Sequence, residues 1–143
     1  EVLKIAEEFR SGSGVGNRLT LAPGDMFTDE LPRLGAGDQE AILLSNVLHD
    51  WDVPECQELI RRCADALPPG GQLLIHDVFL SDALDGPLPI ALYSAALFTL
   101  TEGRAYSAAE YREWLNAAGL SVTGPTPTLI HCGVLVGTKR RSL

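Results

Sequence analysis

The chain of 143 residues has little positive charge. Its 11 lysine and arginine residues stand against 19 aspartate and glutamate residues, which gives a formal net charge of −8. A protein that binds nucleic acid or an anionic membrane surface needs basic side chains to neutralise phosphates. The basic cluster Lys139-Arg140-Arg141 is too short to form such a surface. We therefore expect neither nucleic acid nor a membrane among the partners of this protein.

Cysteine and long apolar runs are also scarce. The three cysteines, Cys56, Cys63 and Cys132, form no C-x-x-C pair, which argues against a disulfide framework and against a structural zinc site. The spacing of Cys56 and Cys63 places both on one face of a helix, as small apolar side chains. No apolar run approaches about 18 residues, the length of a membrane-spanning helix. These features predict a cytoplasmic protein without a metal site.

Helical periodicity and short apolar runs alternate along the chain. A capping residue at Asp52 with Pro54 in the first turn predicts one helix start, and the capping box Ser107 to Glu110 predicts another. Such alternation is typical of an α/β fold whose sheet is built on parallel crossovers. The predicted elements, in chain order, are a helix over 2–10, strands over 18–21 and 41–46, a helix over 52–67, a strand over 72–79, helices over 89–100 and 107–118, and strands over 120–123 and 129–138.

A histidine follows the apolar run 41–44, which predicts a buried strand. His49 would then lie past the carboxyl end of that strand, where open α/β sheets bind ligands, and neutral imidazole accepts protons near neutral pH. The next strand ends near Asp77. Because consecutive parallel strands are often neighbours, Asp77 is a candidate partner of His49. A lone histidine is more often a structural side chain, and from the residues alone the two readings are equally good.

Two other segments suggest ligand contacts. The glycine-rich run 12–16 lacks the preceding strand and following helix of a phosphate-binding loop, so it reads as a turn between a helix and a strand. In Gly24-Asp25-Met26-Phe27, the Asp25 carboxylate could accept a hydrogen bond from an exocyclic amine, and the Met26 thioether could pack on a flat ring. A turn with a core methionine explains the same four residues.

Taken together, the motifs resemble those of the S-adenosylmethionine-dependent O-methyltransferases of the caffeic-acid and hydroxyindole type. The resemblance covers nearly the whole chain, and the order of the motifs is more specific than any one of them. The matching motifs are Gly24-Asp25-Met26-Phe27, Leu44-Ser45-Asn46-Val47-Leu48-His49-Asp50-Trp51, Ala66-Leu67-Pro68-Pro69-Gly70-Gly71, Thr101-Glu102-Gly103-Arg104 and Ala118-Gly119-Leu120.

On the acceptor side, the resemblance implies a base flanked by acids. The family's H-D-W histidine, here His49, deprotonates the acceptor hydroxyl, and an acid after the following strand, here Asp77, flanks it. The family often has a second flanking glutamate, which falls on Ala105 in this chain, with Glu102 nearby as the candidate replacement. The implied substrate is a small aromatic with a phenolic hydroxyl, and no metal is required. An apolar wall over 89–101, with Tyr93, Leu97 and Phe98, is a candidate acceptor pocket, and core packing explains those three residues equally well.

On the donor side, the resemblance implies that Asp25, Met26 and Phe27 of the G-D-M-F motif hold the adenine of S-adenosylmethionine, with Trp51 beside it. Ser45 stands near the donor, at a position where several relatives carry a lysine.

The resemblance also implies a Rossmann-like fold with sheet order 3-2-1-4-5-7-6. It further implies segments that this chain lacks: an N-terminal helical dimerisation domain, and the first two strands with their glycine-rich donor loop. The chain is therefore interpreted as the C-terminal portion of a homodimeric enzyme. Two alternatives remain: S-adenosylmethionine-dependent hydroxylation or decarboxylation on the same fold, and a truncated remnant without catalytic activity.

Overall fold

The computed structural model describes residues 1–14, 16–32 and 40–141. It divides into two compact units, Glu1–Glu30 and Leu31–Leu143, which are treated separately below. The first unit contains helix α1 (Val2–Gly12), the 3₁₀ turn η1 (Gly16–Arg18) and the turn of the Gly-Asp-Met-Phe motif. The second contains the sheet and every other helix of the described residues.

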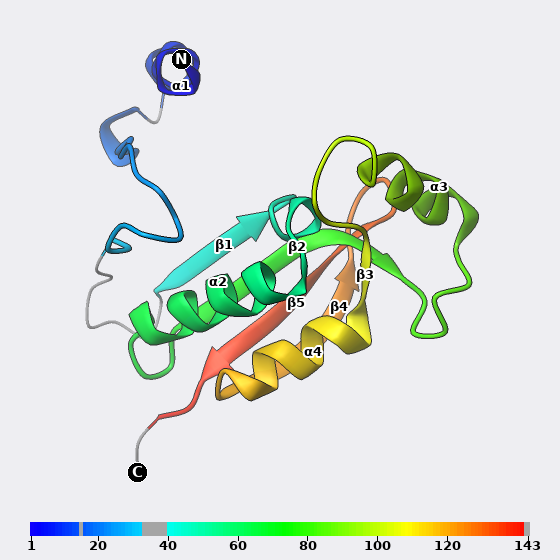
Figure 1. Cartoon of the computed structure of the whole chain (residues 1–143). Coiled ribbons are helices and arrows are strands. Elements are labelled where there is room, and N and C mark those ends of the chain that lie inside the picture. The colour runs from blue at the N-terminus through cyan, green and yellow to red at the C-terminus, as the bar shows by residue number, and fades with distance from the viewer. Residues whose placement is uncertain (15, 33–39, 142–143) are drawn as a thin grey trace. The chain divides into compact units, whose positions relative to one another are not determined.

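The second unit is built on a sheet of four long strands, β1 (Ala41–Ser45), β2 (Gln72–Leu80), β4 (Leu120–Pro127) and β5 (Cys132–Lys139). Their order is β1-β2-β5-β4, and a two-residue strand, β3 (Tyr106–Ser107), pairs in parallel with the end of β2 (Figure 1). β1 and β2 are parallel, as the sequence predicts. The order matches the 4-5-7-6 part of the sheet that the resemblance implies.

The expectation of parallel crossovers fails at the last strand, β5. β5 runs antiparallel to both β2 and β4. The short connection between β4 and β5 explains this, because only antiparallel neighbours can be joined by a hairpin.

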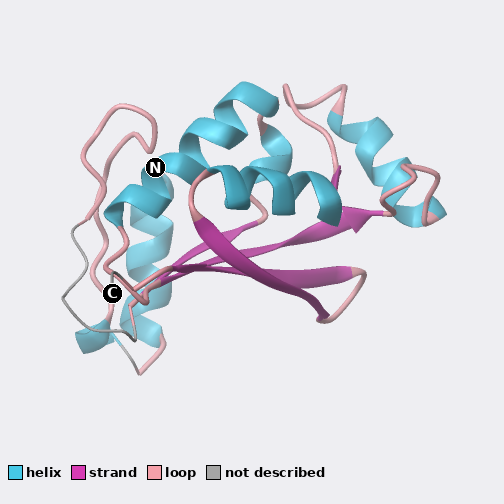
Figure 2. Ribbon diagram, turned by 90° about the horizontal axis from the view of Figure 1, so that it is seen from below, coloured by secondary structure: helices cyan, strands magenta, loops and turns pink. Residues whose placement is uncertain are grey.

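Two helices, α2 (Val53–Ala66) and α4 (Ala108–Ala117), cover one face of this sheet (Figures 1 and 2). The strands alternate in burial along their length, so every second side chain of β2 faces these helices. The core contains Leu59, Ile60, Cys56 and Cys63 of α2, Tyr111 and Leu115 of α4, and Leu73, Ile75 and Leu135 of the sheet. Asp77 lies on the same buried side of β2 as this core.

The helix boundaries confirm the sequence signals. The Asp52 carboxylate accepts a hydrogen bond from the Val53 amide (2.7 Å), and Ser107 and Glu110 form a complete capping box. At the other end of α2, the Lys139 ammonium of β5 donates to the carbonyls of Ala64 and Leu67, both at 2.8 Å. These bonds satisfy carbonyls that a helix end leaves without an intrahelical partner.

Two sequence predictions about strands are wrong. Residues 18–21 form no strand: the 3₁₀ turn η1 ends at Arg18, and no strand of the described ranges pairs with the residues that follow. A strand needs a ladder partner for its backbone groups. The strand over 41–45 exists but is not buried, because β1 is the edge of the described sheet and Leu43 is 61% exposed. No helix in the described part of the chain is long and apolar enough to cross a membrane.

Candidate active site

The turn after β1 places His49 beyond the carboxyl end of that strand. β1 stops at Ser45, and Asn46 adopts a left-handed backbone conformation with φ of 53°, which asparagine tolerates better than most residues. Its amide still donates to the His76 carbonyl of β2 (2.9 Å). The chain then forms the 3₁₀ turn η2 (Leu48–Asp50), in which Leu48 is fully buried as an anchor and His49 is 5% exposed.

The backbone around η2 is held by one side chain from α2 and one from β3. The Cys56 thiol of α2 donates to the Leu48 carbonyl (3.1 Å), and the Tyr106 hydroxyl of β3 donates to the Trp51 carbonyl (2.7 Å). Burial raises the pKa of the Cys56 thiol to about 12, so this thiol stays protonated and acts as a donor. The position of His49 is therefore fixed by the fold and not by its own side chain alone.

A glycine packs directly against this turn. A Cβ atom built on Gly103 would lie 2.5 Å from the Trp51 carbonyl oxygen and 2.6 Å from the Trp51 nitrogen, and closer still to the His49 carbonyl oxygen. These neighbours are backbone atoms, which have little room to move away. Gly103 thus allows the segment after helix α3 (Leu88–Leu97) to approach the His49 turn closely.

Replacing Gly103 with alanine is expected to lower the free energy of unfolding by about 1–3 kcal/mol, the usual cost of overpacking a tight site. Urea denaturation of the intact natural protein measures this change. Gly12→Ala is the matched control, because a Cβ at Gly12 meets nothing within 4 Å. Equal stability of the Gly103→Ala and Gly12→Ala variants would contradict the close approach.

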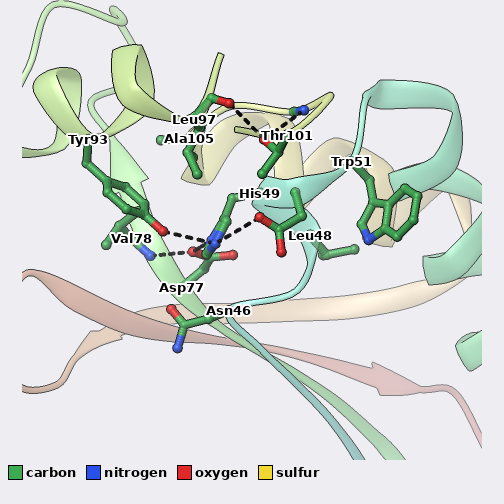
Figure 3. Close-up of polar contacts among 12 residues, drawn as sticks. Asn46, Leu48, His49, Trp51, Asp77, Val78, Tyr93, Leu97, Thr101 and Ala105 are labelled. Carbon is green, nitrogen blue, oxygen red and sulfur yellow. Dashed lines mark hydrogen bonds and ion pairs between the residues drawn. The ribbon is translucent and has the colours of Figure 1, made fainter. Parts of the chain in front are cut away.

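His49 and Asp77 form a buried pair at the carboxyl ends of β1 and β2. The His49 Nδ1 atom lies 2.7 Å from Asp77 Oδ1, and Asp77 is only 1% exposed (Figure 3). The Val78 amide donates to the same carboxylate oxygen (2.8 Å), and the Tyr111 hydroxyl lies 3.5 Å from the other oxygen. Because a carboxylate only accepts, Nδ1 carries the proton in the neutral imidazole, and Nε2 is then left as an acceptor.

The charge of Asp77 makes His49 a stronger base. Burial alone lowers the pKa of His49, but the hydrogen bond and the charge of Asp77, with a smaller contribution from Asp50, raise it above its ordinary value overall. Asp50 is half exposed, and its Oδ1 lies 3.7 Å from Nε2. Asp77 is therefore the orienting partner, as the sequence suggested, and the adjacent Asp50 is not.

The Nε2 atom of His49 meets a side chain from α3. The Tyr93 hydroxyl lies 3.0 Å from Nε2, and the two rings meet edge to face at 5.5 Å (Figure 3). α3 is tied to the segment before β3 by the Ser94 hydroxyl, which accepts from the Ala105 amide (3.1 Å). Of the other two candidates for an apolar wall, Leu97 is buried in the core and Phe98 is exposed.

An apolar pocket of about 220 Å³ opens beside Tyr93, near the His49–Asp77 pair. It is lined by Asn46, Val78, Pro89, Ile90, Tyr93, Ile130 and His131. Apolar pockets with a few convergent polar groups are typical of small-molecule sites.

The second acid expected beside His49 is not brought to it. Glu102 is exposed, and it contacts the turn through its backbone amide, which donates to the Asp50 carbonyl (3.3 Å). Ala105, at the position of the family's glutamate, is fully buried. Within the described ranges, the polar partners of the His49 ring are Asp77, Tyr93 and Asp50, and Glu102 is not among them.

The five donor-side candidates fall in both units. In the first unit, Asp25 Oδ1 accepts from the amides of Phe27 (2.8 Å) and Thr28 (3.3 Å), so the motif forms a tight turn with Met26 and Phe27 half buried. In the second unit, the Ser45 hydroxyl lies 2.9 Å from His76 Nδ1. Trp51 is half buried, and Figure 3 shows its ring directed away from the His49 imidazole.

Sequence reasoning missed two contacts of the site. It offered Tyr93 only as a wall residue, and it did not consider Tyr111 at all. A tyrosine on a predicted helix carries no signal that its hydroxyl reaches a particular histidine. The one available signal is the capping box, which fixes where α4 begins; the contacts of Tyr111 with Asp77 and Phe79 of β2 are visible only in the structure.

The fold and the site define the class of protein: an α/β methyltransferase fold with a histidine–aspartate pair at the end of its parallel strands. The chain belongs to the O-methyltransferase domain family, whose model matches residues 1–121. It is 39% identical over 120 residues to 3-hydroxy-5-methyl-1-naphthoate 3-O-methyltransferase of Streptomyces sahachiroi, an alignment that covers 84% of this chain and 34% of the relative. The chain thus spans about a third of the length of the curated relatives it matches.

Solved structures of methyltransferases also superpose on this chain. An O-methyltransferase family 2 protein from Planctomyces limnophilus, in complex with apigenin, superposes with a TM-score of 0.91 at 51% identity, over 96% of this chain and 40% of that one. Human N-acetylserotonin methyltransferase in complex with S-adenosylmethionine superposes with a TM-score of 0.75 at 30% identity, over 83% and 33%.

One relative performs different chemistry. L-tyrosine C(3)-methyltransferase of Streptomyces lavendulae is 35% identical over 146 residues, covering 95% of this chain and 36% of the relative.

Within the described ranges, no group of three or more His, Cys, Asp or Glu side chains is placed to hold a metal ion.

Proposed function

We propose that these residues are the C-terminal portion of the catalytic domain of an S-adenosylmethionine-dependent O-methyltransferase. Its acceptor is a phenolic hydroxyl of a small aromatic compound, and His49 is the general base. The observation that carries this proposal is the buried His49–Asp77 pair, whose Nε2 contacts Tyr93, a residue that lines the apolar pocket. The naphthoate and apigenin named for two relatives are aromatic compounds with the right chemistry for such a pocket.

In the proposed reaction, the residues of this chain carry out one proton transfer. S-adenosylmethionine supplies an electrophilic methyl group, and the electron pair of its sulfur–methyl bond leaves with the thioether S-adenosylhomocysteine. The protein must therefore align the acceptor oxygen and remove its proton. His49 Nε2 takes that proton while the oxygen forms its bond to the methyl carbon. Asp77 holds the ring by Nδ1 and stabilises the positive charge that the imidazole gains. Alignment supplies much of the rate, and a positioned base adds roughly 10²- to 10⁴-fold.

The donor-side assignment is also a proposal, and it rests on the chemistry of the residues. In the first unit, the Asp25 carboxylate suits an exocyclic amine, and Met26 and Phe27 offer a thioether and a flat ring that suit an adenine. In the second unit, Trp51 offers a flat ring, and Ser45 would contact the donor through its hydroxyl. Glu102 remains a proposed second acid that would have to turn toward the acceptor. The whole enzyme is proposed to be a cytoplasmic homodimer.

The proposed function predicts both a product and a pH profile. The intact natural protein, given S-adenosylmethionine and a panel of phenols, is expected to yield methyl ethers. Only neutral His49 can accept the acceptor proton, so kcat/KM should rise with pH. Because Asp77 raises the pKa of His49, the midpoint of that rise should lie above about 6.5, the ordinary histidine value. Product mass and NMR, with initial rates from pH 5 to 9, measure these outcomes.

The outcomes separate the alternatives. A product heavier by one oxygen atom would indicate hydroxylation, and loss of carbon dioxide would indicate decarboxylation. No product and no heat of S-adenosylmethionine binding in calorimetry would favour a non-catalytic remnant. A rate that is flat from pH 5 to 9 would reject His49 as the base.

Methylation at a ring carbon is the second candidate function, favoured by the relative that methylates C3 of tyrosine. The same base serves both reactions, because removing a phenolic proton also makes the neighbouring ring carbon nucleophilic. The two products have equal mass, and NMR distinguishes the methyl ether from the ring methyl.

A further inference from the structure

The Nε2 atom of His49, the proposed base, already has a hydrogen-bonding partner within the protein. Tyr93 places its phenolic hydroxyl 3.0 Å from His49 Nε2 (Figure 3). In the neutral imidazole that a general base requires, Nδ1 donates its proton to the Asp77 carboxylate, so Nε2 has a lone pair and no proton. In this state of His49, the Tyr93 hydroxyl is the donor in the contact with Nε2.

This arrangement is the one that a phenolic acceptor must adopt before its proton is transferred. A general base must lie within about 2.6–3.2 Å of the proton-bearing atom it serves, and Tyr93 meets that requirement on Nε2. The Nε2 lone pair accommodates one such donor along its axis. A bound phenol and Tyr93 therefore cannot both occupy it.

We propose that Tyr93 is an internal stand-in for the acceptor: its hydroxyl occupies His49 Nε2 until a phenolic substrate displaces it. The proposal rests on the proposed function, because it requires His49 to be the base that meets the acceptor hydroxyl. Tyr93 is thus a positioning residue that sets the affinity for acceptor and product, and it takes no part in the proton transfer itself.

The surroundings of Tyr93 allow this displacement. Its side chain is 41% exposed, so the ring can turn toward solvent without breaking the core. Its neighbour Ser94 holds α3 in place through the Ala105 amide, so only the Tyr93 side chain has to move. The ring that leaves Nε2 also leaves the edge of the pocket formed by Asn46, Val78 and Ile90, which widens the space for an incoming aromatic ring.

The exchange has a consequence for both acceptor and product. An acceptor trades the Tyr93–His49 hydrogen bond for an equivalent one of its own, so this contact adds little to its affinity. The methyl ether product has no hydroxyl proton to donate to Nε2. The return of Tyr93 to His49 then favours product release.

Tyr93→Phe keeps the ring and removes the competing hydroxyl. In the intact natural protein this substitution is expected to lower both the acceptor KM and the inhibition constant of the methyl ether by the same factor. That factor is about 2- to 10-fold, the usual net effect of one neutral hydrogen bond. The kcat at saturating acceptor should stay unchanged where proton transfer limits the rate, and should fall where product release limits it. Initial rates and calorimetric titration with the methyl ether measure these quantities.

Tyr106→Phe is the matched control, since it removes a buried tyrosine hydroxyl that bonds the Trp51 carbonyl and does not contact the His49 ring. It should lower stability without tightening acceptor or product. A higher KM in Tyr93→Phe, or a kcat/KM that falls, would overturn the proposal and indicate that Tyr93 contacts the bound acceptor. Failure of the proposed function is visible separately, as absence of methyl ether formation by the wild-type protein.

Discussion

Replacing His49 with glutamine is expected to lower the rate of methyl transfer in the intact natural protein by roughly 10²- to 10⁴-fold, the contribution of a positioned general base. The glutamine amide has no basic lone pair that can take the acceptor proton. It can still donate a hydrogen bond to Asp77, so the buried carboxylate keeps a partner. Alanine would remove the imidazole from that buried carboxylate and leave it only the Val78 amide and the Tyr111 hydroxyl, so a loss of activity in His49→Ala would be confounded with a loss of stability.

The rate of a single turnover, with saturating S-adenosylmethionine and a phenol, measures the effect of His49→Gln. The dissociation constant for S-adenosylmethionine should be unchanged, because the donor-side candidates are other residues. His76→Gln is the matched control: His76 precedes Asp77 on β2, so its side chain lies on the opposite face of the sheet. His76 contacts the Ser45 hydroxyl, so this variant should retain most of its turnover at saturating S-adenosylmethionine even if the donor binds less tightly. Equal rates for His49→Gln and the wild type would show that another group removes the proton.

Replacing Asp77 with asparagine is expected to lower turnover by about 10²- to 10⁴-fold, through the loss of charge beside the imidazole. The imidazolium that forms during proton transfer would lack its stabilising carboxylate. An amide that turns its nitrogen toward Nδ1 would also favour the wrong tautomer, with the proton on Nε2. Single-turnover rates and thermal unfolding together separate this effect from a loss of stability.

The pH profile gives a second measurement that tests Asp77 specifically. Asp77 raises the pKa of His49 against the opposing effect of burial, so its loss should move the acidic limb of the pH profile to lower pH. Asp50→Asn is the matched control, since Asp50 is half exposed and lies 3.7 Å from Nε2. It should lower turnover far less than Asp77→Asn and shift the limb only slightly. A pH profile in Asp77→Asn that coincides with the wild type would contradict the pairing.

Much of the site could be predicted from the sequence because parallel strands bring their carboxyl ends together. The apolar runs before His49 and Asp77 predicted two adjacent strands, and β1 and β2 are indeed parallel neighbours. That adjacency alone suggested the pair, which the structure confirms at 2.7 Å. The capping box at Ser107 predicted the start of α4 for the same kind of local reason.

Predictions that depended on distant partners failed. Residues 18–21 alternate like a strand, but backbone groups form a ladder only when another strand lies beside them, and the described residues supply none. The run 41–45 is as apolar as a buried strand, yet Leu43 is exposed because β1 is an edge strand in the described sheet. The role of Glu102 as a flanking acid stays a prediction, and its side chain is exposed in the structure.

The sequence by itself determined the family, the helix caps and the candidate base with its acid. Each of these depends on neighbours along the chain or on the ends of adjacent strands. Only the tertiary structure decided that Gly103 packs against the His49 turn and that the Tyr93 hydroxyl contacts His49 Nε2. These contacts join residues 44 to 54 positions apart in the sequence, and their geometry depends on how α3 and the segment before β3 fold back over the end of the sheet. Local patterns carry no record of such a path, because the same apolar helix could equally have packed its tyrosine into the core.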